Sequence, residues 1–343
     1  MRIGVIGATG AVGREMVDEL AESSVPNDAK VELFASPRSE GETIAFRGQS
    51  LKVRAYSLEN VKGCDYILMS AGGTFSKTHS PAISSQGAVV IDNSSAFRMD
   101  PNVPLLIPEV NGAVLKGFKQ GIIANPNCST IQMLVAVNPL KEKFGLKMIV
   151  VATYQSVSGS GQKGIKELSE QLQNYLKFET PSHELYPQPI ASNVLSAIGS
   201  FESGKNCEEE LKMVNETHKI LDLPKLPILA TTARVPVFAC HSEAINIQLE
   251  QEVDLEEIKR VFVEAPGLDF NDSTSQADLP SPFHCTGKKG VFVSRLRSLF
   301  GKSRSEWIQF WNVADNLKKG AATNAVQILE LLLRNMSSAE KRS

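Results

Sequence analysis

The chain has 343 residues, of which 42% are hydrophobic and 22% are charged, and its formal net charge is −2. This length exceeds the roughly 250–300 residues that one hydrophobic core usually serves, so we expect two domains. The near-balance of charge, without a long block of one sign, argues against a nucleic-acid-binding surface or a polybasic membrane patch. No apolar run approaches the ~18 residues of a membrane span, so we expect no membrane partner.

Strands and helices alternate in the first half of the chain. Short apolar segments at 2–7, 30–35, 65–71 and 87–94 are typical of strands, and segments 11–23 and 75–86 have the spacing of helices. Such alternation predicts a parallel sheet with helices on both faces. We therefore expect an α/β domain of the Rossmann type over 1–127.

The pattern changes in the second half. A strand at 146–156 and a charged helix at 161–177 are followed by β-rich segments at 244–250, 290–297 and 307–315. Their closer spacing predicts a mixed or antiparallel sheet, so residues 128–314 form an α+β domain in this interpretation. A final helix within 315–336 has enough apolar surface to pack on a sheet, and we expect it to complete the first domain. The last residues, 337–343, are expected to be a frayed polar tail.

Cysteine usage indicates the compartment. The five cysteines are odd in number, scattered, and form no Cys-x-x-Cys pair, so we expect neither a disulfide framework nor a zinc or other metal site. The N-terminus lacks the apolar stretch and cleavage site of a signal peptide. These features predict reduced thiols in a cytoplasmic protein.

A glycine-rich segment joins the first strand to the first helix. Gly7, Gly10 and Gly13 are spaced Gly-x-x-Gly-x-x-Gly there. Glycine lets the backbone turn tightly and approach a pyrophosphate, which the N–H groups of the helix start can bind. This spacing is less common than Gly-x-Gly-x-x-Gly, and an ordinary strand-to-helix turn is the alternative. We interpret the segment as a dinucleotide-binding loop.

The end of the second strand indicates which dinucleotide binds. NAD-binding proteins usually place a carboxylate there for the ribose 2′-hydroxyl. Here Ser36, Arg38 and Ser39 follow the strand, and Glu40 lies beyond the expected contact point. These side chains can donate to a 2′-phosphate, so we predict NADP(H) as the cofactor. The alternative is that Arg38 is a solvated loop cation.

Cys128 lies where the loop Asn125-Pro126-Asn127 gives way to an apolar helix. A helix N-terminus stabilises a negative charge by up to ~2 kcal/mol, which would lower a thiol pKa by about one unit. A histidine partner would help further, and the chain has five: His79, His183, His218, His241 and His284. Spacing alone does not single out His241. It lies seven residues after Arg234, which would place the two on opposite faces of one strand unless the chain bends.

Four segments together resemble one family: GATGAVG at 7–13, NPNCST at 125–130, QSVSGSG at 155–161 and RVPVFACHSEA at 234–244. In this order they are similar to aspartate-β-semialdehyde dehydrogenase of the bacterial type. A related family, N-acetyl-γ-glutamyl-phosphate reductase, typically has glycine before the nucleophile, whereas this chain has Asn127. That reductase is the first alternative, and a catalytically inactive NADP-sensing module is the second.

The resemblance implies an activity. It is the reversible, NADP-dependent conversion of L-4-aspartyl phosphate to L-aspartate 4-semialdehyde and phosphate, in lysine/diaminopimelate, threonine and methionine biosynthesis. In that family a cysteine forms a thioester that NADPH reduces. The resemblance also implies a homodimer built through the second domain, with a tetramer as the alternative.

The resemblance assigns roles by position. Cys128 is the nucleophile, His241 the acid/base and Gln155 the residue that orients the acyl group. Separately from the resemblance, the developing oxyanion needs donors, and we expect Asn127 and the backbone N–H groups at the helix start to supply them. The substrate would be held by Arg98 and Lys212 at phosphate, Arg234 at the carboxylate, and Glu209 at the amine, with Glu208 and Glu210 as alternatives to Glu209. Cofactor contacts would come from Thr9, Gly10, Ala11, Val12, Arg38, Ser39, Ser158, Gly159 and Asn316.

Each of these roles has a structural alternative. Arg98 could pair with a nearby aspartate, Lys212 and Glu209 could form a surface ion pair, and Gln155 could face solvent. Asn316 could cap the final helix. Segment 158–161 could be a plain linker.

Overall fold

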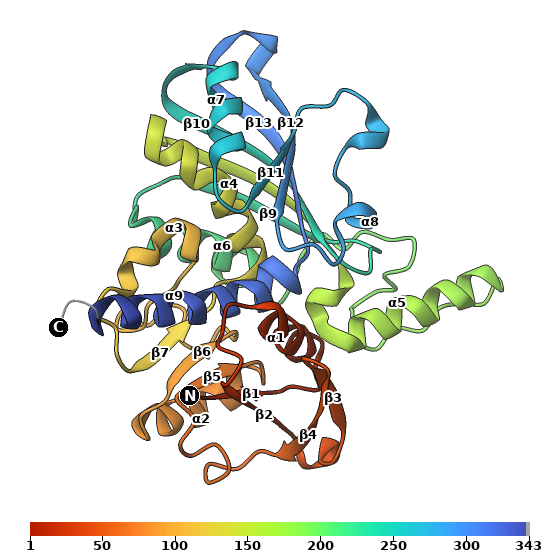
Figure 1. Ribbon diagram of the computed structural model, residues 1–343. Helices are drawn as coiled ribbons and strands as arrows, with labels where there is room; N and C mark the ends of the chain where they lie inside the picture. The colour runs from red at the N-terminus through yellow and green to blue at the C-terminus, as the bar shows by residue number, and fades with distance from the viewer. Residues whose placement is uncertain (341–343) are drawn as a thin grey trace. The chain divides into compact units, whose positions relative to one another are not determined.

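The computed structural model describes residues 1–340 and divides into two compact units. The first comprises Met1–Pro126 and the chain from Ala321 onward, and the second is Asn127–Gly320. Figure 1 shows the elements of each unit. No helix in the described part of the chain is long and apolar enough to cross a membrane.

The first unit is built on a seven-stranded sheet with the order β3-β4-β2-β1-β5-β6-β7. Only the β3–β4 pair is antiparallel, which gives the doubly wound α/β architecture expected of the N-terminal half. Strands β3, β4 and β7 were not predicted from the sequence. The strands are β1 (Arg2–Ile6), β2 (Lys30–Ala35), β3 (Thr43–Phe46), β4 (Gln49–Ala55), β5 (Tyr66–Met69), β6 (Val89–Asp92) and β7 (Gly121–Ala124).

Helices α1 (Ala11–Glu22) and α9 (Thr323–Glu340) pack on this sheet. Leu20 of α1 and Leu329 of α9 belong to one buried cluster with the strand residues Val5 and Leu68. The C-terminal helix therefore joins the first unit, as expected. The remaining helices of the unit are α2 (Gly73–Ser85) and α3 (Pro108–Asn111), with 3₁₀ turns η1 (Pro37–Ser39) and η2 (Gly112–Leu115).

The bounds predicted for the final helix were wrong at both ends. Strand β13 continues to Ala314, and the carboxylate of Asp315 then accepts from the N–H of Leu317 at 2.9 Å, which turns the chain. A π-helical turn, η7 (Lys318–Ala322), follows before α9 begins. At its other end α9 extends to Glu340, so most of the tail expected to be frayed is helical; the last three residues lie outside the described part.

The second unit is built on a six-stranded sheet with the order β11-β12-β13-β10-β8-β9. The outer pairs β11–β12 and β8–β9 are parallel and the other pairs are antiparallel, so the mixed sheet is confirmed. The strands are β8 (Met148–Gln155), β9 (Ile228–Arg234), β10 (His241–Asp254), β11 (Leu268–Asn271), β12 (Val291–Ser298) and β13 (Arg304–Ala314).

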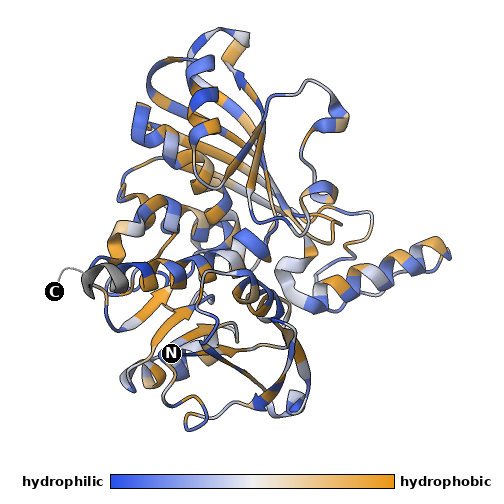
Figure 2. Cartoon of the chain, in the orientation of Figure 1, coloured by the Kyte–Doolittle hydropathy of each residue, from blue (hydrophilic) through white to orange (hydrophobic). Residues whose placement is uncertain are grey.

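One face of this sheet is buried and the other is partly exposed. Ile245 of β10 and Phe310 of β13 are buried, on the face that α4 (Cys128–Phe144) and α7 (Leu255–Glu264) cover. On the other face Tyr154 and Leu229 are exposed. Figure 2 shows that hydrophobic residues run along the strands of both sheets, whereas α5 carries a mixture. The other helices are α5 (Gly161–Leu176), α6 (Glu208–Leu221) and α8 (Pro282–Cys285), with 3₁₀ turns η3 (Val157–Ser160), η4 (Ser203–Lys205), η5 (Gln276–Asp278) and η6 (Leu299–Gly301).

Candidate active site

Cys128 is the first residue of α4. The preceding Asn127 is the N-cap, and its Oδ1 accepts from the backbone N–H groups of Ser129 at 2.9 Å and Thr130 at 3.2 Å. Asparagine is among the best residues for this position because its side chain satisfies helix donors that have no partner within the helix. The helix therefore begins at a fixed residue, and Cys128 is only partly buried there.

The rest of Asn127 is also engaged. Its backbone N–H donates to Glu216 Oε2 at 2.6 Å, and its Nδ2 donates to Glu209 Oε1 at 2.8 Å. The side chain expected to donate to an oxyanion thus makes hydrogen bonds within the protein at both ends. Its role in this structure is to fix the start of α4 against α6.

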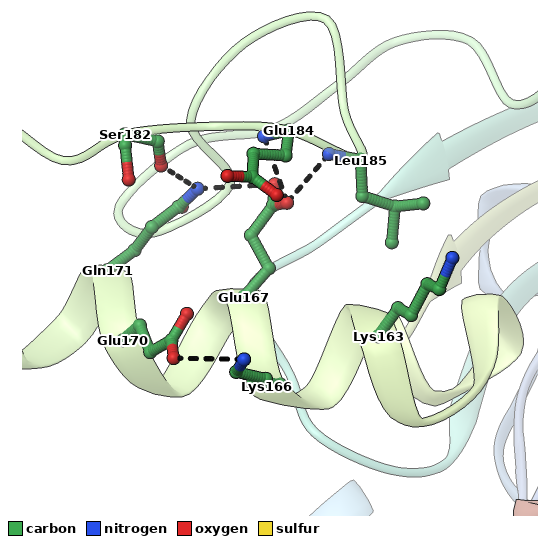
Figure 3. A pocket seen from close by; sticks show the side chains of 8 residues that line it. All are labelled: Lys163, Lys166, Glu167, Glu170, Gln171, Ser182, Glu184 and Leu185. Atoms are coloured by element: carbon green, nitrogen blue, oxygen red, sulfur yellow. Dashed lines mark hydrogen bonds and ion pairs between the residues drawn. The ribbon is translucent and has the colours of Figure 1, made fainter.

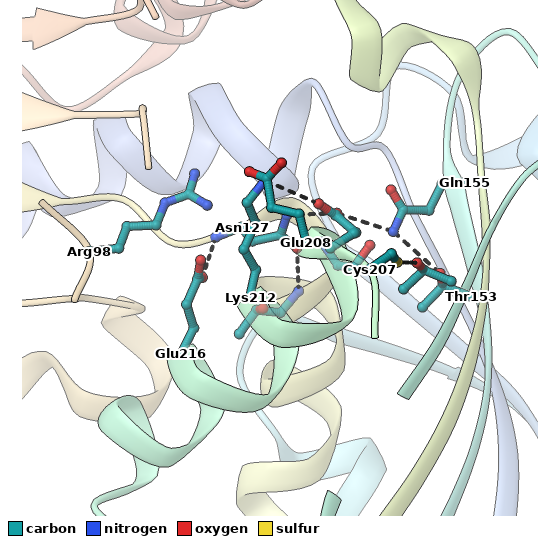
Figure 4. A network of polar contacts seen from close by, with 12 residues as sticks. Arg98, Asn127, Thr153, Gln155, Cys207, Glu208, Lys212 and Glu216 are labelled. Carbon is teal, nitrogen blue, oxygen red and sulfur yellow. Dashed lines mark hydrogen bonds and ion pairs between the residues drawn. The ribbon is translucent and has the colours of Figure 1, made fainter. Parts of the chain in front are cut away.

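Glu209 is the centre of a polar network that includes Asn127 and Gln155, both labelled in Figure 4. Its Oε1 accepts from Asn127 and, at 3.2 Å, from Nε2 of Gln155, which also donates to Thr153 Oγ1 at 3.3 Å. Gln155 is only 1% exposed, so the alternative that it faces solvent is wrong. The structure thus brings together three residues predicted from the sequence on three elements: Asn127 before α4, Gln155 on β8 and Glu209 on α6.

Burial distinguishes Glu209 from Glu208 and Glu210, which are both only partly buried. The side chain of Glu209 is 8% exposed, whereas that of Glu208 is 46% exposed. Lys212 makes ion pairs with both, at 2.7 Å to Glu208 and 3.6 Å to Glu209. The ion pair considered as an alternative role for Lys212 is therefore present.

His241 is fully buried at the first position of β10. The backbone N–H of Ser156 donates to its Nδ1 at 3.1 Å, so Nδ1 is the acceptor and the ring proton of a neutral imidazole lies on Nε2. Nε2 has no hydrogen-bond partner in the described part of the chain. Burial, together with the nearby charge of Arg234, lowers the pKa of His241 to about 3. His241 is therefore neutral at pH 7 in the free protein.

Arg234 and His241 lie on different strands, which removes the difficulty of their odd spacing. Arg234 ends β9 and His241 begins β10, and the chain turns between them through Cys240, whose φ is +68°. Arg234 Nη1 donates to the backbone oxygen of Ser156 at 2.8 Å. A Cβ on Gly159 would lie 2.8 Å from the same Nη1 and 3.4 Å from the ring of His241. Only glycine fits at 159 without displacing these side chains.

Asn316 supports this segment rather than capping α9. Its Oδ1 accepts from the hydroxyls of Ser156 and Ser158, each at 3.0 Å, and from the backbone N–H of Cys240 at 3.1 Å. The Ser158 and Asn316 side chains, expected at the cofactor, make these contacts within the second unit. Ser156 was missed by sequence reasoning although it lies inside the QSVSGSG segment, because only the fold reveals that its backbone fixes the tautomer of His241.

Gly320, in the π-helical turn η7, lies against the cysteine. A Cβ at this position would be 2.8 Å from Cys128 Cβ and 3.3 Å from its Cα. No motif in the sequence indicated this contact, since Gly320 lies outside the expected motifs. A π-turn is a common feature of functional sites.

The glycine-rich loop of the first unit has the expected local form. Gly7 has a φ of +83°, and a Cβ there would lie 2.2 Å from the backbone oxygen of Ser70. A Cβ on Gly13 would lie 2.0 Å from the oxygen of Gly7, so this glycine lets α1 pack closely on the loop. Gly10 is the N-cap of α1 and supplies no side-chain cap. The loop thus leaves a side-chain-free cradle at a helix N-terminus, which fits a pyrophosphate.

The residues after β2 lie beside this loop. Thr9 Oγ1 and Ser39 Oγ are 3.2 Å apart, which brings the loop and the 3₁₀ turn η1 together. Ser36 and Arg38 are exposed at the same turn. This cluster of donors fits the 2′-phosphate of NADP.

Arg98 is 8% exposed in the first unit. Its Nε donates to the backbone oxygen of Asn125 at 2.9 Å and its Nη2 to that of Asn93 at 3.0 Å. These two contacts fix the guanidinium against the loop that leads to Asn127.

A surface cavity of about 380 Å³ in the second unit lies away from the predicted residues (Figure 3). It is bounded by α5 and segment 182–185, and Glu167 accepts there from the backbone N–H groups of Glu184 and Leu185. None of the residues predicted to act in catalysis lines it. Within residues 1–340 no group of three or more histidine, cysteine or acidic side chains is placed to hold a metal ion.

Comparisons with known proteins identify relatives over nearly the whole chain. Residues 2–118 match the family model described as semialdehyde dehydrogenase, NAD binding domain, and residues 137–319 match semialdehyde dehydrogenase, dimerisation domain. The chain is 46% identical to aspartate-semialdehyde dehydrogenase of Aquifex aeolicus over 97% of this chain and 98% of that protein. It is 43% identical to that of Bacillus subtilis over 97% of each.

Solved structures include a similar fold. Aspartate semialdehyde dehydrogenase II of Vibrio cholerae, complexed with ASA, superposes with a TM-score of 0.91 at 41% identity and covers 97% of this chain and 98% of that chain. The two family models thus each match one of the two units, and the relatives match the chain over nearly its whole length. The chain belongs to the aspartate-semialdehyde dehydrogenase family.

Proposed function

We propose that this protein is an NADP-dependent aspartate-semialdehyde dehydrogenase that interconverts L-4-aspartyl phosphate with L-aspartate 4-semialdehyde and phosphate. The observation that carries the proposal is Cys128, a partly buried thiol at a capped helix start, in the unit that also holds the Gln155–Glu209 network and His241. Metabolically, the reaction belongs to lysine, threonine and methionine biosynthesis.

Cys128 supplies the nucleophile. Its thiolate sulfur bonds to the acyl carbon of aspartyl phosphate, and the bond to the phosphate oxygen breaks, so phosphate leaves with that electron pair. NADPH supplies the hydride that reduces the resulting thioester. The tetrahedral thiohemiacetal then releases the aldehyde and regenerates the thiolate.

The neighbouring side chains have matching roles. His241, neutral and with its proton on Nε2, donates a hydrogen bond to the acyl oxygen as it becomes anionic. Arg234 presents a planar fork to the substrate carboxylate, and Glu209 attracts the substrate amine. Gln155 orients the acyl group from β8. Arg98 and Lys212 supply the two cations that a phosphate dianion requires.

The first unit would hold the cofactor. Gly7, Gly10 and Gly13 leave the backbone open to the pyrophosphate, with Thr9, Ala11 and Val12 at the helix start. Ser36, Arg38 and Ser39 would bind the 2′-phosphate. Ser158, Gly159 and Asn316 would contact the nicotinamide half, in addition to the hydrogen bonds that they make in the free protein.

The test is an NADP-reduction assay with aspartate semialdehyde, with phosphate added or omitted, and a parallel assay with N-acetylglutamate semialdehyde. We expect phosphate-dependent turnover with the first substrate only. Cys128→Ala should abolish turnover while leaving NADP affinity within a few-fold. Mass spectrometry of the quenched wild-type enzyme should find the acyl group on the peptide that carries Cys128. Turnover by Cys128→Ala would contradict the covalent mechanism, and NADP binding without any turnover by the wild type would favour a sensor.

The proposal includes a homodimer formed through the exposed face of the six-stranded sheet. Tyr154 and Leu229 are exposed on that face, and Tyr154 packs against Trp311 with ring centroids 5.5 Å apart. The face lies within the segment that matches the dimerisation domain. Sedimentation of the wild type should give a dimer, with a tetramer as the alternative. Leu229→Glu should produce monomers.

A cytoplasmic location is supported by five free thiols, which suit a reducing compartment.

A further inference from the structure

A buried polar cluster behind His241 has no part in the proposed chemistry. It consists of Gln132 on α4, Glu243 on β10 and Asn312 on β13, and all three residues are 0% exposed. Gln132 lies four residues after Cys128 and therefore on the same face of α4, one turn along. Glu243 lies two residues after His241. The cluster thus connects the helix that carries the nucleophile with the strand that carries the histidine.

The hydrogen bonds of the cluster join these elements directly. Asn312 Nδ2 donates to the backbone oxygen of Gln132 at 2.9 Å and to Glu243 Oε2 at 3.2 Å. Gln132 Nε2 reaches the backbone oxygen of His241 at 3.4 Å. Three different elements are therefore linked by amide donors within one turn of the reacting residues.

Among the residues that the structure describes, three oxygen atoms of the cluster have no hydrogen-bond partner: Gln132 Oε1, Glu243 Oε1 and Asn312 Oδ1. If Glu243 were ionised, all three would be acceptors, and the second N–H of Gln132 Nε2 could serve only one of them. A proton on Glu243 Oε1 converts one acceptor into a donor, and the two amide oxygens supply acceptors for it. Buried polar groups are rarely left unpaired, so the protonated form suits the site better.

The side chains that neighbour Glu243 in the described part of the chain are uncharged. Gln132 faces it from α4, and Asn312 and Thr153 are its register partners on β13 and β8. The titratable group two residues away on its own strand is His241, which is neutral at pH 7. Burial raises the pKa of Glu243 well above its usual value, and the amide of Gln132 offsets only part of this. Leaving a carboxylate charged here without a cation would be costly.

We propose that Glu243 is a neutral carboxylic acid in the folded protein and a positioning residue, which holds the His241 strand against the helix that bears Cys128. The claim that Glu243 positions the reacting residues rests on the proposed function. The claim that Glu243 is protonated concerns only the folded chain and does not depend on that function. Two independent measurements therefore test it.

The first measurement is the pH dependence of unfolding. The unfolded chain releases the Glu243 proton near pH 4.5, whereas the folded chain keeps it, so unfolding releases a proton at higher pH. The contribution of Glu243 to the free energy of unfolding is fully present below pH 4.5 and is lost as the pH rises toward the pKa of Glu243 in the folded protein. Glu243→Gln removes the linkage. The ratio of wild-type to variant unfolding constants should rise about tenfold per pH unit, or about 100-fold from pH 5.5 to 7.5. A ratio that stays flat would mean an ionised Glu243 and would overturn the proposal.

The second measurement is kinetic. Glu243→Gln keeps a neutral donor of the same shape, so kcat should stay within about threefold of the wild type. Glu243→Ala removes the link between α4 and β10, and kcat should fall about 10- to 100-fold with little change in KM, because small misplacements of reacting groups cost this much. An equal loss in both variants would show that a charge is needed, and an unchanged kcat in Glu243→Ala would show a merely structural role; either result refutes the positioning claim.

A matched control is Ser294→Ala. Ser294 is fully buried on β12 of the same sheet, and its hydroxyl has no partner in the described part of the chain. This variant should change neither kcat nor the pH dependence of unfolding. If the wild type shows no turnover with aspartate semialdehyde, the proposed function fails, and the unfolding measurement still decides the protonation state of Glu243.

Discussion

Gly320→Ala should disable the enzyme by moving its nucleophile. The added methyl group would lie 2.8 Å from Cys128 Cβ, 3.3 Å from its Cα and 3.6 Å from Asn316 Cβ. Carbon atoms pack best at about 3.5–4.0 Å, so either the π-turn or the start of α4 must shift by roughly 0.7–1.2 Å. A displacement of that size at a reacting atom lowers the rate by about 100-fold. The overpacking itself costs about 1–3 kcal/mol of stability, so the variant should still fold.

The assay is phosphate-dependent NADP reduction, together with the rate at which iodoacetamide alkylates Cys128. We expect kcat to fall about 100-fold, the alkylation rate to change, and NADP affinity to remain near that of the wild type. Gly290→Ala is the matched control, because a Cβ at this position meets its nearest neighbour, in Phe292, at an ordinary 3.7 Å. Wild-type kcat in Gly320→Ala would refute the steric reasoning.

Three further predictions concern single side chains. Because the folded pKa of His241 is about 3, below its unfolded value of 6.5, its contribution to stability is present above pH 6.5 and is lost as the pH falls. Denaturant titrations should show up to about 5 kcal/mol of acid destabilisation that His241→Gln lacks, and parallel curves would contradict the neutral histidine. Arg38→Ala should raise KM for NADPH roughly 10- to 100-fold and leave KM for NADH unchanged; equal changes would remove Arg38 from the 2′-phosphate site. Arg98→Leu should raise KM for phosphate roughly 10- to 100-fold and far more than KM for the semialdehyde, and equal changes would refute its role.

The sequence predicted what depends on short segments. Periodicity indicated the parallel sheet of the first unit, and closer spacing of β-rich segments indicated the mixed sheet of the second. The Asn-Pro-Asn-Cys segment predicted a cysteine at a helix start, and α4 begins at that residue. Helix capping and turn formation depend on residues that are adjacent in the sequence, and they can therefore be predicted from it.

Contacts between distant segments could not be predicted in this way. Gly320 touches Cys128 across nearly 200 residues of chain, and its requirement for a glycine is visible only once both lie in one unit. The N–H of Ser156 reaches His241 because β8 pairs with β10, and the strand register determines that pairing. In the sequence, Glu243 is an ordinary polar residue near the end of a strand. Only the structure shows that it is buried under α4, where burial favours the uncharged acid.

The neutral state of His241 limits what this residue can do in the free enzyme. With Nδ1 occupied by the Ser156 N–H, only Nε2 is left for the proposed reaction, and it carries a proton that a neutral imidazole does not readily give up. Nε2 is therefore suited to donate a hydrogen bond to an oxyanion rather than to remove a proton from the thiol of Cys128. Proton removal by His241 would require another hydrogen-bonding arrangement at Nδ1, which the pairing of β8 with β10 opposes. In the proposed mechanism, the oxygen of the thiohemiacetal, and not the sulfur, is therefore the atom that this histidine would stabilise most.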